Sequence, residues 1–164
     1  IKFPTRNRPE KFLKCINNIF TKTSDKANTR VVVTADKDDA SMFNKKMLVQ
    51  LKPYIDNYNL EIIFGKSESK IHACNRDLEL LGEWDILMLM SDDMVFENES
   101  FDYKVREGFK TFFQDMDGNI FFNDGFANDR ISTLPIIGRK YFERFGYIYH
   151  PSYKSLWCDK TGIR

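Results

Sequence analysis

Short apolar runs alternate with amphipathic stretches along the first half of the chain. The runs are rich in β-branched residues, such as Val31-Val32-Val33, which favours buried strands. In the amphipathic stretches, apolar residues recur at i, i+3, i+4 and i+7, which predicts one buried face on a helix. The predicted strands are residues 1–4, 29–35, 60–64 and 85–90, and the predicted helices are residues 9–20, 41–51 and 71–81.

This repeated order of strand and helix predicts an α/β fold with a mostly parallel sheet, right-handed crossovers and flanking helices. The later pattern is less regular and predicts a helix over 103–113, a strand over 119–123 and a short helix over 141–145. We therefore predict a single domain over residues 1–164. Its first half, residues 1–96, would bind a nucleotide, and its irregular second half, residues 97–164, would meet the substrate.

The most abrupt change from apolar to charged residues lies between the run 86–90 and the Ser91-Asp92-Asp93 that follows it. The run is too short to span a membrane and fits a buried parallel strand. Two adjacent carboxylates at a strand end are costly unless a cation or solvent offsets their charge. Ligands of open α/β sheets bind beyond the carboxyl ends of the strands, which favours a site for a metal ion and a polyanion. A solvated turn or a helix cap explains the pair equally well.

Polar residues also follow the first two predicted strands, so three strand ends would meet at one edge of the sheet. Arg6 and Arg8 carry forked donors that suit phosphate, although solvation is the commoner fate of a lone arginine. Asp36 either accepts hydrogen bonds from a base or a ribose, or forms a turn with the acidic residues beside it. Lys70 and Asn75 flank the start of the third helix, where anions are attracted, but both also fit a solvated surface.

Asp93 is the strongest candidate for a metal ligand, because Mg²⁺ and Mn²⁺ prefer carboxylate oxygens and substrate phosphates. Asp92, on the other face of the chain, suits a sugar hydroxyl. In the tail, Asp159 lies close to Trp157, which suits a general base beside a stacking surface for a sugar. His150 is a further candidate for a metal ligand or a phosphate contact, although a lone histidine is more often structural.

The composition narrows the class of protein. The formal net charge of +1 over 164 residues lacks the basic excess expected of a nucleic-acid binder. No apolar stretch reaches the ~18 residues of a membrane span, and no signal peptide is visible. Three widely spaced cysteines form neither a metal pattern nor a disulfide framework, which favours a cytoplasmic location. Because the chain begins at Ile1 and not at Met, we expect a trimmed protein.

Taken together, these motifs resemble the family 2-like glycosyltransferases of the GT-A fold, over nearly the whole chain. Each motif is short and degenerate, but their order and spacing are fairly specific. In chain order, the motifs are Pro4–Pro9, the acidic cluster at Asp36, Ser69–Asp77, Ser91–Met94, Thr133–Gly138 and Leu156–Asp159.

The resemblance implies a metal-dependent transferase, of the hexosyltransferase type, that moves a sugar from a nucleoside-diphosphate sugar to an acceptor hydroxyl. It implies Mn²⁺ or Mg²⁺ at Asp93, bridging the donor phosphates. It also implies that Asp159 is the base that deprotonates the acceptor, with inversion at the anomeric carbon. The remaining matched positions would bind the donor: Thr5, Arg6 and Asp36 the nucleoside, Lys70 and Asn75 the ribose or diphosphate, and Asp92 the ribose.

The chain departs from the family pattern at two places. The usual Asp-x-Asp triplet reads Ser91-Asp92-Asp93, and residues 160–164 lack the acidic and aromatic residues expected after Asp159. We therefore expect a truncated acceptor side. The donor sugar and base, the acceptor (glycan, lipid or protein) and the oligomeric state are left open by the sequence.

Other classes of protein fit parts of the pattern. A non-catalytic or truncated module that binds nucleotide sugar or carbohydrate is one alternative, and donor hydrolysis would distinguish it, because a catalytic domain usually transfers some sugar to water. A sugar nucleotidyltransferase is disfavoured because Pro4–Pro9 contains no glycine for a phosphate loop. A phosphoacceptor receiver domain would need a lysine at a late strand end and a regular fivefold repeat, neither of which we find.

Overall fold

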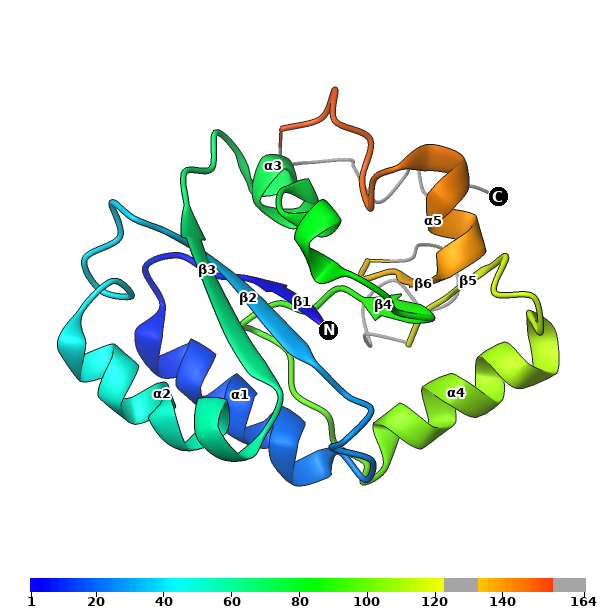
Figure 1. Cartoon of the computed structure of the whole chain (residues 1–164), viewed down its shortest axis with the longest axis horizontal. Helices are drawn as coiled ribbons and strands as arrows, with labels where there is room; N and C mark the ends of the chain where they lie inside the picture. The colour runs from blue at the N-terminus through cyan, green and yellow to red at the C-terminus, as the bar shows by residue number, and fades with distance from the viewer. Residues whose placement is uncertain (123–132, 155–164) are drawn as a thin grey trace. The chain divides into compact units, whose positions relative to one another are not determined.

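The structure is a computed structural model and describes residues 1–122 and 133–154. The chain forms two compact units that are interleaved in sequence. The first unit contains residues 1–66 and 90–105, and the second contains residues 67–89 and the chain from residue 106. Each unit has its own three-stranded sheet (Figure 1). The division of function at residue 96 stays a prediction.

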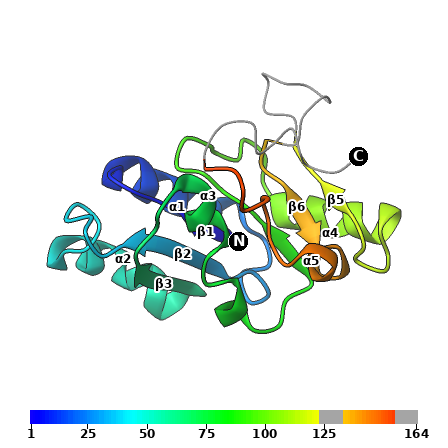
Figure 2. The ribbon, with the colours of Figure 1, turned by 90° about the horizontal axis from the view of Figure 1, so that it is seen from above.

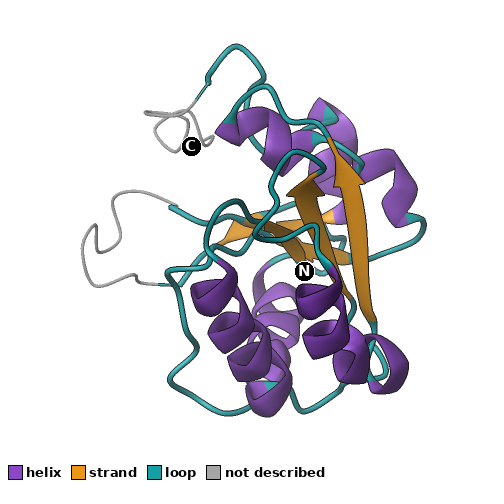
Figure 3. Ribbon diagram, turned by 90° about the vertical axis from the view of Figure 1, so that its left-hand side faces the viewer, coloured by secondary structure: helices purple, strands orange, loops and turns teal. Residues whose placement is uncertain are grey.

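The sheet of the first unit is parallel, with the strands in sequence order. Val33 lies opposite Phe3 on one neighbour and Ile62 on the other. The central strand is buried along its whole length, as its β-branched residues predict, and the two longest strands run side by side (Figure 3). The expected α/β core with a parallel sheet is confirmed. Its strands are β1 (Lys2–Pro4), β2 (Val31–Asp36) and β3 (Leu60–Gly65).

Two helices, α1 (Pro9–Lys22) and α2 (Lys45–Asn57), cover one face of this sheet (Figure 1). Pro9 stands in the first turn of α1, where its missing N–H costs nothing. Phe20 of α1 stacks on Tyr54 of α2, with ring centroids 5.6 Å apart. The two helices therefore form one layer beneath the strands. The apolar face of α1 is buried, as its spacing predicts, through Phe12, Cys15, Ile16, Ile19 and Phe20.

Helix α2 differs from the predicted helix 41–51 at both ends. It begins later because the side chain of Asn44 caps it, accepting a hydrogen bond from the backbone of Met47 at 2.9 Å. It also continues through Pro53, which was expected to end it. Proline removes one backbone bond, here to the carbonyl of Val49. Because Val49 is exposed, water can take that bond and the helix continues.

The sheet of the second unit is antiparallel, with β6 in the centre, and Figure 2 shows β5 beside β6. The predicted fourth strand, residues 85–90, is divided between two partners. Its end meets β1, because the N–H of Met90 donates to the carbonyl of Lys2 at 2.9 Å, whereas β4 pairs antiparallel with a strand that the sequence pattern did not reveal. That strand is only three residues long and lies directly after Pro135, so its periodicity is too short to detect. The strands are β4 (Ile86–Met88), β5 (Asn119–Ile120) and β6 (Ile136–Gly138).

The predicted helix 71–81 is broken in two. Asp77 adopts a left-handed backbone with φ 64°, which an α-helix cannot continue. Beside this break, Ile71, Cys74, Leu89 and Tyr149 form a small apolar cluster. No helix in the described part of the chain is long and apolar enough to cross a membrane. The remaining helices are α3 (Lys70–Asn75), the 3₁₀ helix η1 (Leu78–Leu81), α4 (Phe101–Phe112) and α5 (Arg139–Phe145).

Candidate functional site

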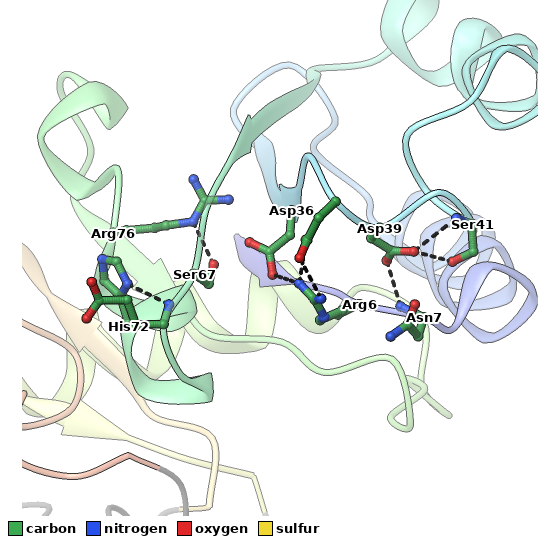
Figure 4. A network of polar contacts seen from close by, with 10 residues as sticks. Arg6, Asn7, Asp36, Asp39, Ser41, Ser67, His72 and Arg76 are labelled. Carbon is green, nitrogen blue, oxygen red and sulfur yellow. Dashed lines mark hydrogen bonds and ion pairs between the residues drawn. The ribbon is translucent and has the colours of Figure 1, made fainter.

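The loops after β1 and β2 meet in the first unit, because parallel neighbours end at the same edge of a sheet. Arg6 follows β1 and points at Asp36, the last residue of β2 (Figure 4). The Nη1 atom of Arg6 lies 2.5 Å from Oδ2 of Asp36. Asp36 is almost fully buried, with 6% of its side chain exposed, whereas the side chain of Arg6 is 46% exposed. The pair therefore places a buried acceptor behind an accessible donor.

Arg6 also holds Asp38 with a forked contact. Its Nη1 and Nη2 atoms donate to the two carboxylate oxygens of Asp38 at 2.8 and 3.0 Å. The hydrogen bond to Asp38, followed by the one to Asp36, raises the pKa of Arg6 above its usual value. The same contact lowers the pKa of Asp38. Arg6, Asp36 and Asp38 therefore form a preformed arginine–carboxylate network at this edge of the sheet.

Asp39 ties the two loops together. Its buried carboxylate accepts from the backbone N–H of Asn7 at 2.7 Å and from the backbone and hydroxyl of Ser41 at 3.0 and 2.6 Å (Figure 4). Burial by itself raises the pKa of Asp39, but these hydrogen bonds outweigh it and the pKa lies below its usual value. In the sequence Asp39 is one member of an acidic cluster. The Asp39–Ser41 spacing, typical of a side-chain-capped turn, is the signal that identifies its role.

The acidic turn, residues 91–94, belongs to the same unit. Asp92 lies 2.9 Å from Nη1 of Arg8 and 3.5 Å from the hydroxyl of Thr5. Only 7% of its side chain is exposed, whereas Asp93 is exposed. The predicted residues Thr5, Arg6, Asp36, Asp92 and Asp93 are thus brought together in the first unit.

Helix α1 holds the acidic turn in place. The thiol of Cys15 lies 3.1 Å from the carbonyl oxygen of Met94. Burial, and next the charges of Asp92 and Asp93, raise the pKa of Cys15 to about 12, so the thiol remains a hydrogen-bond donor. The amide of Asn18 donates to the carbonyl of Phe96 at 3.1 Å and accepts from its N–H at 2.7 Å. These contacts hold the backbone that directly follows the two carboxylates.

In the second unit, the side-chain amide of Asn75 makes hydrogen bonds to backbone groups. Its Oδ1 accepts from the N–H groups of Ile148 and Tyr149 at 3.0 and 3.1 Å, and its Nδ2 donates to the carbonyl of Tyr149 at 2.6 Å. Lys70, the first residue of α3, is exposed, and the capping bond of this helix comes from Ser69. The amide of Asn75 therefore secures a distant segment of chain.

His150 directly follows Tyr149, whose backbone is held by the amide of Asn75. Its ring is exposed and lies against Tyr147 and Tyr153, with centroids 5.3 and 6.2 Å away. Its Nδ1 atom accepts from the backbone N–H of Ser152 at 3.2 Å. Binding to a metal or phosphate would therefore use Nε2. Asp159 lies outside the described residues.

Arg76 forms a second network that the sequence did not reveal. Its Nε donates to the hydroxyl of Ser67 at 3.0 Å (Figure 4), and its Nη1 lies 2.7 Å from the carboxylate of Asp77. The guanidinium is 8% exposed. This pair accompanies the left-handed backbone of Asp77 and helps to fix the break after α3.

The carboxylate oxygens of the acidic turn suit a metal ion that binds together with a phosphate-bearing ligand. No group of three or more His, Cys, Asp or Glu residues in the described part of the chain could hold a metal ion. Asp92 and Asp93 supply adjacent carboxylates in one turn. Mg²⁺ is commonly bound by one or two carboxylates together with substrate phosphates. The residues therefore fit a site that a diphosphate completes, and do not fit a site made by protein side chains alone.

No family model and no curated protein sequence match the chain. Solved structures do match it. The mannosyltransferase PcManGT from Pyrobaculum calidifontis, solved in complex with GDP-Man and Mn²⁺, has a TM-score of 0.68 and 14% identity, over 91% of this chain and 46% of that chain. TarS from S. aureus has a TM-score of 0.65 and 16% identity, over 96% of this chain and 52% of that chain. The chain thus has a glycosyltransferase fold and spans about half the length of these two proteins.

Proposed function

We propose that the protein is a family 2-like glycosyltransferase that moves a sugar from a nucleoside-diphosphate sugar to an acceptor hydroxyl. The observation that carries this proposal is the meeting of Arg6 with Asp36 and of Asp92 with Thr5 and Arg8 in the first unit. These residues come from the loops after two parallel strands and from the acidic turn, where α/β proteins bind ligands. The fold shared with a mannosyltransferase that binds GDP-Man supports the same function.

In this proposal, the buried carboxylate of Asp36 accepts hydrogen bonds from the nucleoside, and Thr5 and Arg6 lie beside it. Asp92 contacts the ribose. Arg6, which is itself held by its forked contact with Asp38, keeps Asp36 in one orientation before the donor arrives. Lys70 and Asn75 in the second unit are assigned to the ribose or diphosphate from the resemblance alone.

Asp93 would hold Mn²⁺ or Mg²⁺, with His150 as a further candidate ligand. When bound, the metal ion would offset the charge that develops on the leaving diphosphate. Asp159 would take the proton of the acceptor hydroxyl while a bond forms between that oxygen and the anomeric carbon. The bond from this carbon to the diphosphate oxygen breaks in the same step, so the configuration inverts.

A second candidate function is a non-catalytic or truncated module that binds a nucleotide sugar. It is favoured by one observation, namely that Asp92 is already paired with Arg8, which leaves this carboxylate less available to a metal ion. Donor hydrolysis distinguishes the two functions. A catalytic domain releases free sugar at a slow rate, whereas a binding module releases none.

The first experiment is a thermal-shift screen of UDP-, GDP-, CDP- and dTDP-sugars, each with and without Mn²⁺. We expect one nucleotide to raise the midpoint of unfolding, and only with Mn²⁺, because a ligand of the native state stabilises it. Calorimetry on Asp93→Ala then tests the metal ligand. This variant should keep its fold and lose Mn²⁺-dependent binding, whereas Glu97→Ala, which removes an exposed charge from the same segment, should keep it. Unchanged Mn²⁺-dependent binding in Asp93→Ala would reject the assignment.

A further inference from the structure

Arg8 contacts the acidic turn, and the proposed function assigns no ligand to its side chain. Its Nη1 atom lies 2.9 Å from Oδ1 of Asp92. The hydrogen bond to Asp92, and next the charge of Asp92, raise the pKa of Arg8, and the charge of Asp93 adds to the effect. The Arg8 side chain is 51% exposed, whereas that of Asp92 is 7% exposed. The guanidinium therefore interacts with both carboxylates from the solvent side.

The local sequence explains this position. Arg8 precedes Pro9, and the residue before a proline is disfavoured in the helical conformation. Arg8 therefore stands outside α1, with φ −137° and ψ 51°, and its side chain makes no capping bond to the helix. Cys15 and Asn18 of the same helix hold the backbone around the acidic turn. Helix α1 thus holds the acidic turn, and the residue directly before this helix, Arg8, supplies the positive charge that faces it.

We propose that Arg8 is a positioning residue that balances the charge of the acidic turn and makes cation binding there depend on a diphosphate. A divalent cation bound by Asp93 would lie close to the guanidinium that pairs with Asp92, and the two positive charges repel each other. A diphosphate brings negative charge that the metal ion and Arg8 can share. The turn should therefore bind Mn²⁺ weakly by itself and more tightly with a nucleoside diphosphate. Only the second half of this statement rests on the proposed function.

If the ion pair between Arg8 and Asp92 were purely structural, removal of Arg8 would have the opposite effect on Mn²⁺ binding. If Arg8 only held Asp92 in place, its removal would loosen the turn and weaken Mn²⁺ binding. If Arg8 balances charge, its removal relieves the repulsion and strengthens Mn²⁺ binding in the absence of nucleotide. The sign of the change therefore separates the two roles.

The experiment is a titration of the whole chain with Mn²⁺ alone, in which the spectrum of free Mn²⁺ is followed by electron paramagnetic resonance. We expect Arg8→Gln to bind Mn²⁺ about fivefold more tightly than the wild type, because one nearby positive charge is removed. Arg8→Lys keeps the charge and should bind like the wild type. Lys11→Gln removes the same charge from an exposed position of α1, and should also bind like the wild type.

The titration is then repeated with GDP and with UDP. Whichever nucleotide binds should tighten Mn²⁺ binding in the wild type, and should do so less in Arg8→Gln. Arg8→Met provides a second variant without the charge, and circular dichroism verifies that each variant is folded. The proposal is overturned if removal of the charge leaves Mn²⁺ binding no tighter than in the wild type, or if Lys11→Gln tightens it equally. If neither nucleotide binds, the proposed function fails, while the titrations with Mn²⁺ alone still decide the role of Arg8.

Discussion

The two units use polar side chains in different ways. In the first unit, the candidate residues contact one another, as Arg6 does with Asp36 and Arg8 with Asp92. In the second unit, the amide of Asn75 makes three hydrogen bonds to backbone groups. An ion pair with an exposed partner can be exchanged for a contact with a ligand. A side chain that satisfies buried or half-buried backbone groups cannot leave without exposing them.

Within the first unit, the same contrast separates two neighbouring acids. The side chain of Asp38 is 69% exposed and accepts hydrogen bonds from Arg6 in the loop after β1. Asp39 is buried and accepts three hydrogen bonds that join the loops after β1 and β2. Exposure therefore distinguishes the acid that can exchange partners from the acid that maintains the loop.

The largest expected effect is on stability, through the hydrogen bonds of Asn75 in the second unit. Asn75→Ala should lower the free energy of unfolding by about 3 kcal/mol, because two N–H groups and one carbonyl lose their partner. Chemical denaturation monitored by circular dichroism measures the change. Lys70→Ala, at the start of the same helix, should change the stability by less than about 0.5 kcal/mol, because Lys70 is exposed. Equal stabilities of the two variants would contradict a structural role for Asn75.

The next effect concerns the buried acid of the first unit. Asp39→Asn should lower the free energy of unfolding at pH 7 by about 2 kcal/mol, because a neutral amide replaces a charged acceptor. The pKa of Asp39 is lower in the folded protein than in the unfolded chain. Its stabilising contribution is therefore present above the unfolded value of about 3.9 and is lost as the pH falls through the folded value.

Urea unfolding at pH 7 and near pH 3 measures this dependence. The difference between Asp39→Asn and the wild type should shrink at the lower pH. Asp38→Asn is the matched control, since it alters the neighbouring exposed acid, and it should unfold like the wild type at both values. An equal loss of unfolding free energy in both variants would contradict the distinction between the exposed Asp38, which can exchange partners, and the buried Asp39, which maintains the loop.

The smallest expected signal is the reactivity of Cys15. Its thiol is buried and its pKa is raised to about 12, so almost no thiolate is present at pH 8. Iodoacetamide should leave Cys15 unmodified in the native protein and modify it in urea, as measured by mass spectrometry of the digested peptides. Cys74, which is buried in the second unit, provides the comparison. Rapid labelling of native Cys15 alone would mean that the acidic turn opens away from α1.

The sequence predicted those features whose signal lies within a few residues. Val31-Val32-Val33 indicated the central strand, and the spacing of apolar residues indicated the buried face of α1. The convergence of the loops that carry Arg6 and Asp36 also followed, because parallel neighbours place their carboxyl ends at one edge, although the ion pair between the two side chains was not predicted. These inferences need only local periodicity and one general rule about parallel sheets.

The tertiary structure decided the choice of distant partners. The antiparallel pairing of β4 with β6, the anchor between Asn75 and Tyr149, and the contact between Arg8 and Asp92 join residues that are far apart in the chain. Local periodicity reports which face of an element is buried, but carries no information about which other segment covers it. The amide of Asn75 and the guanidinium of Arg8 suit many partners equally well. Only the packing of the whole chain selects the one that each contacts.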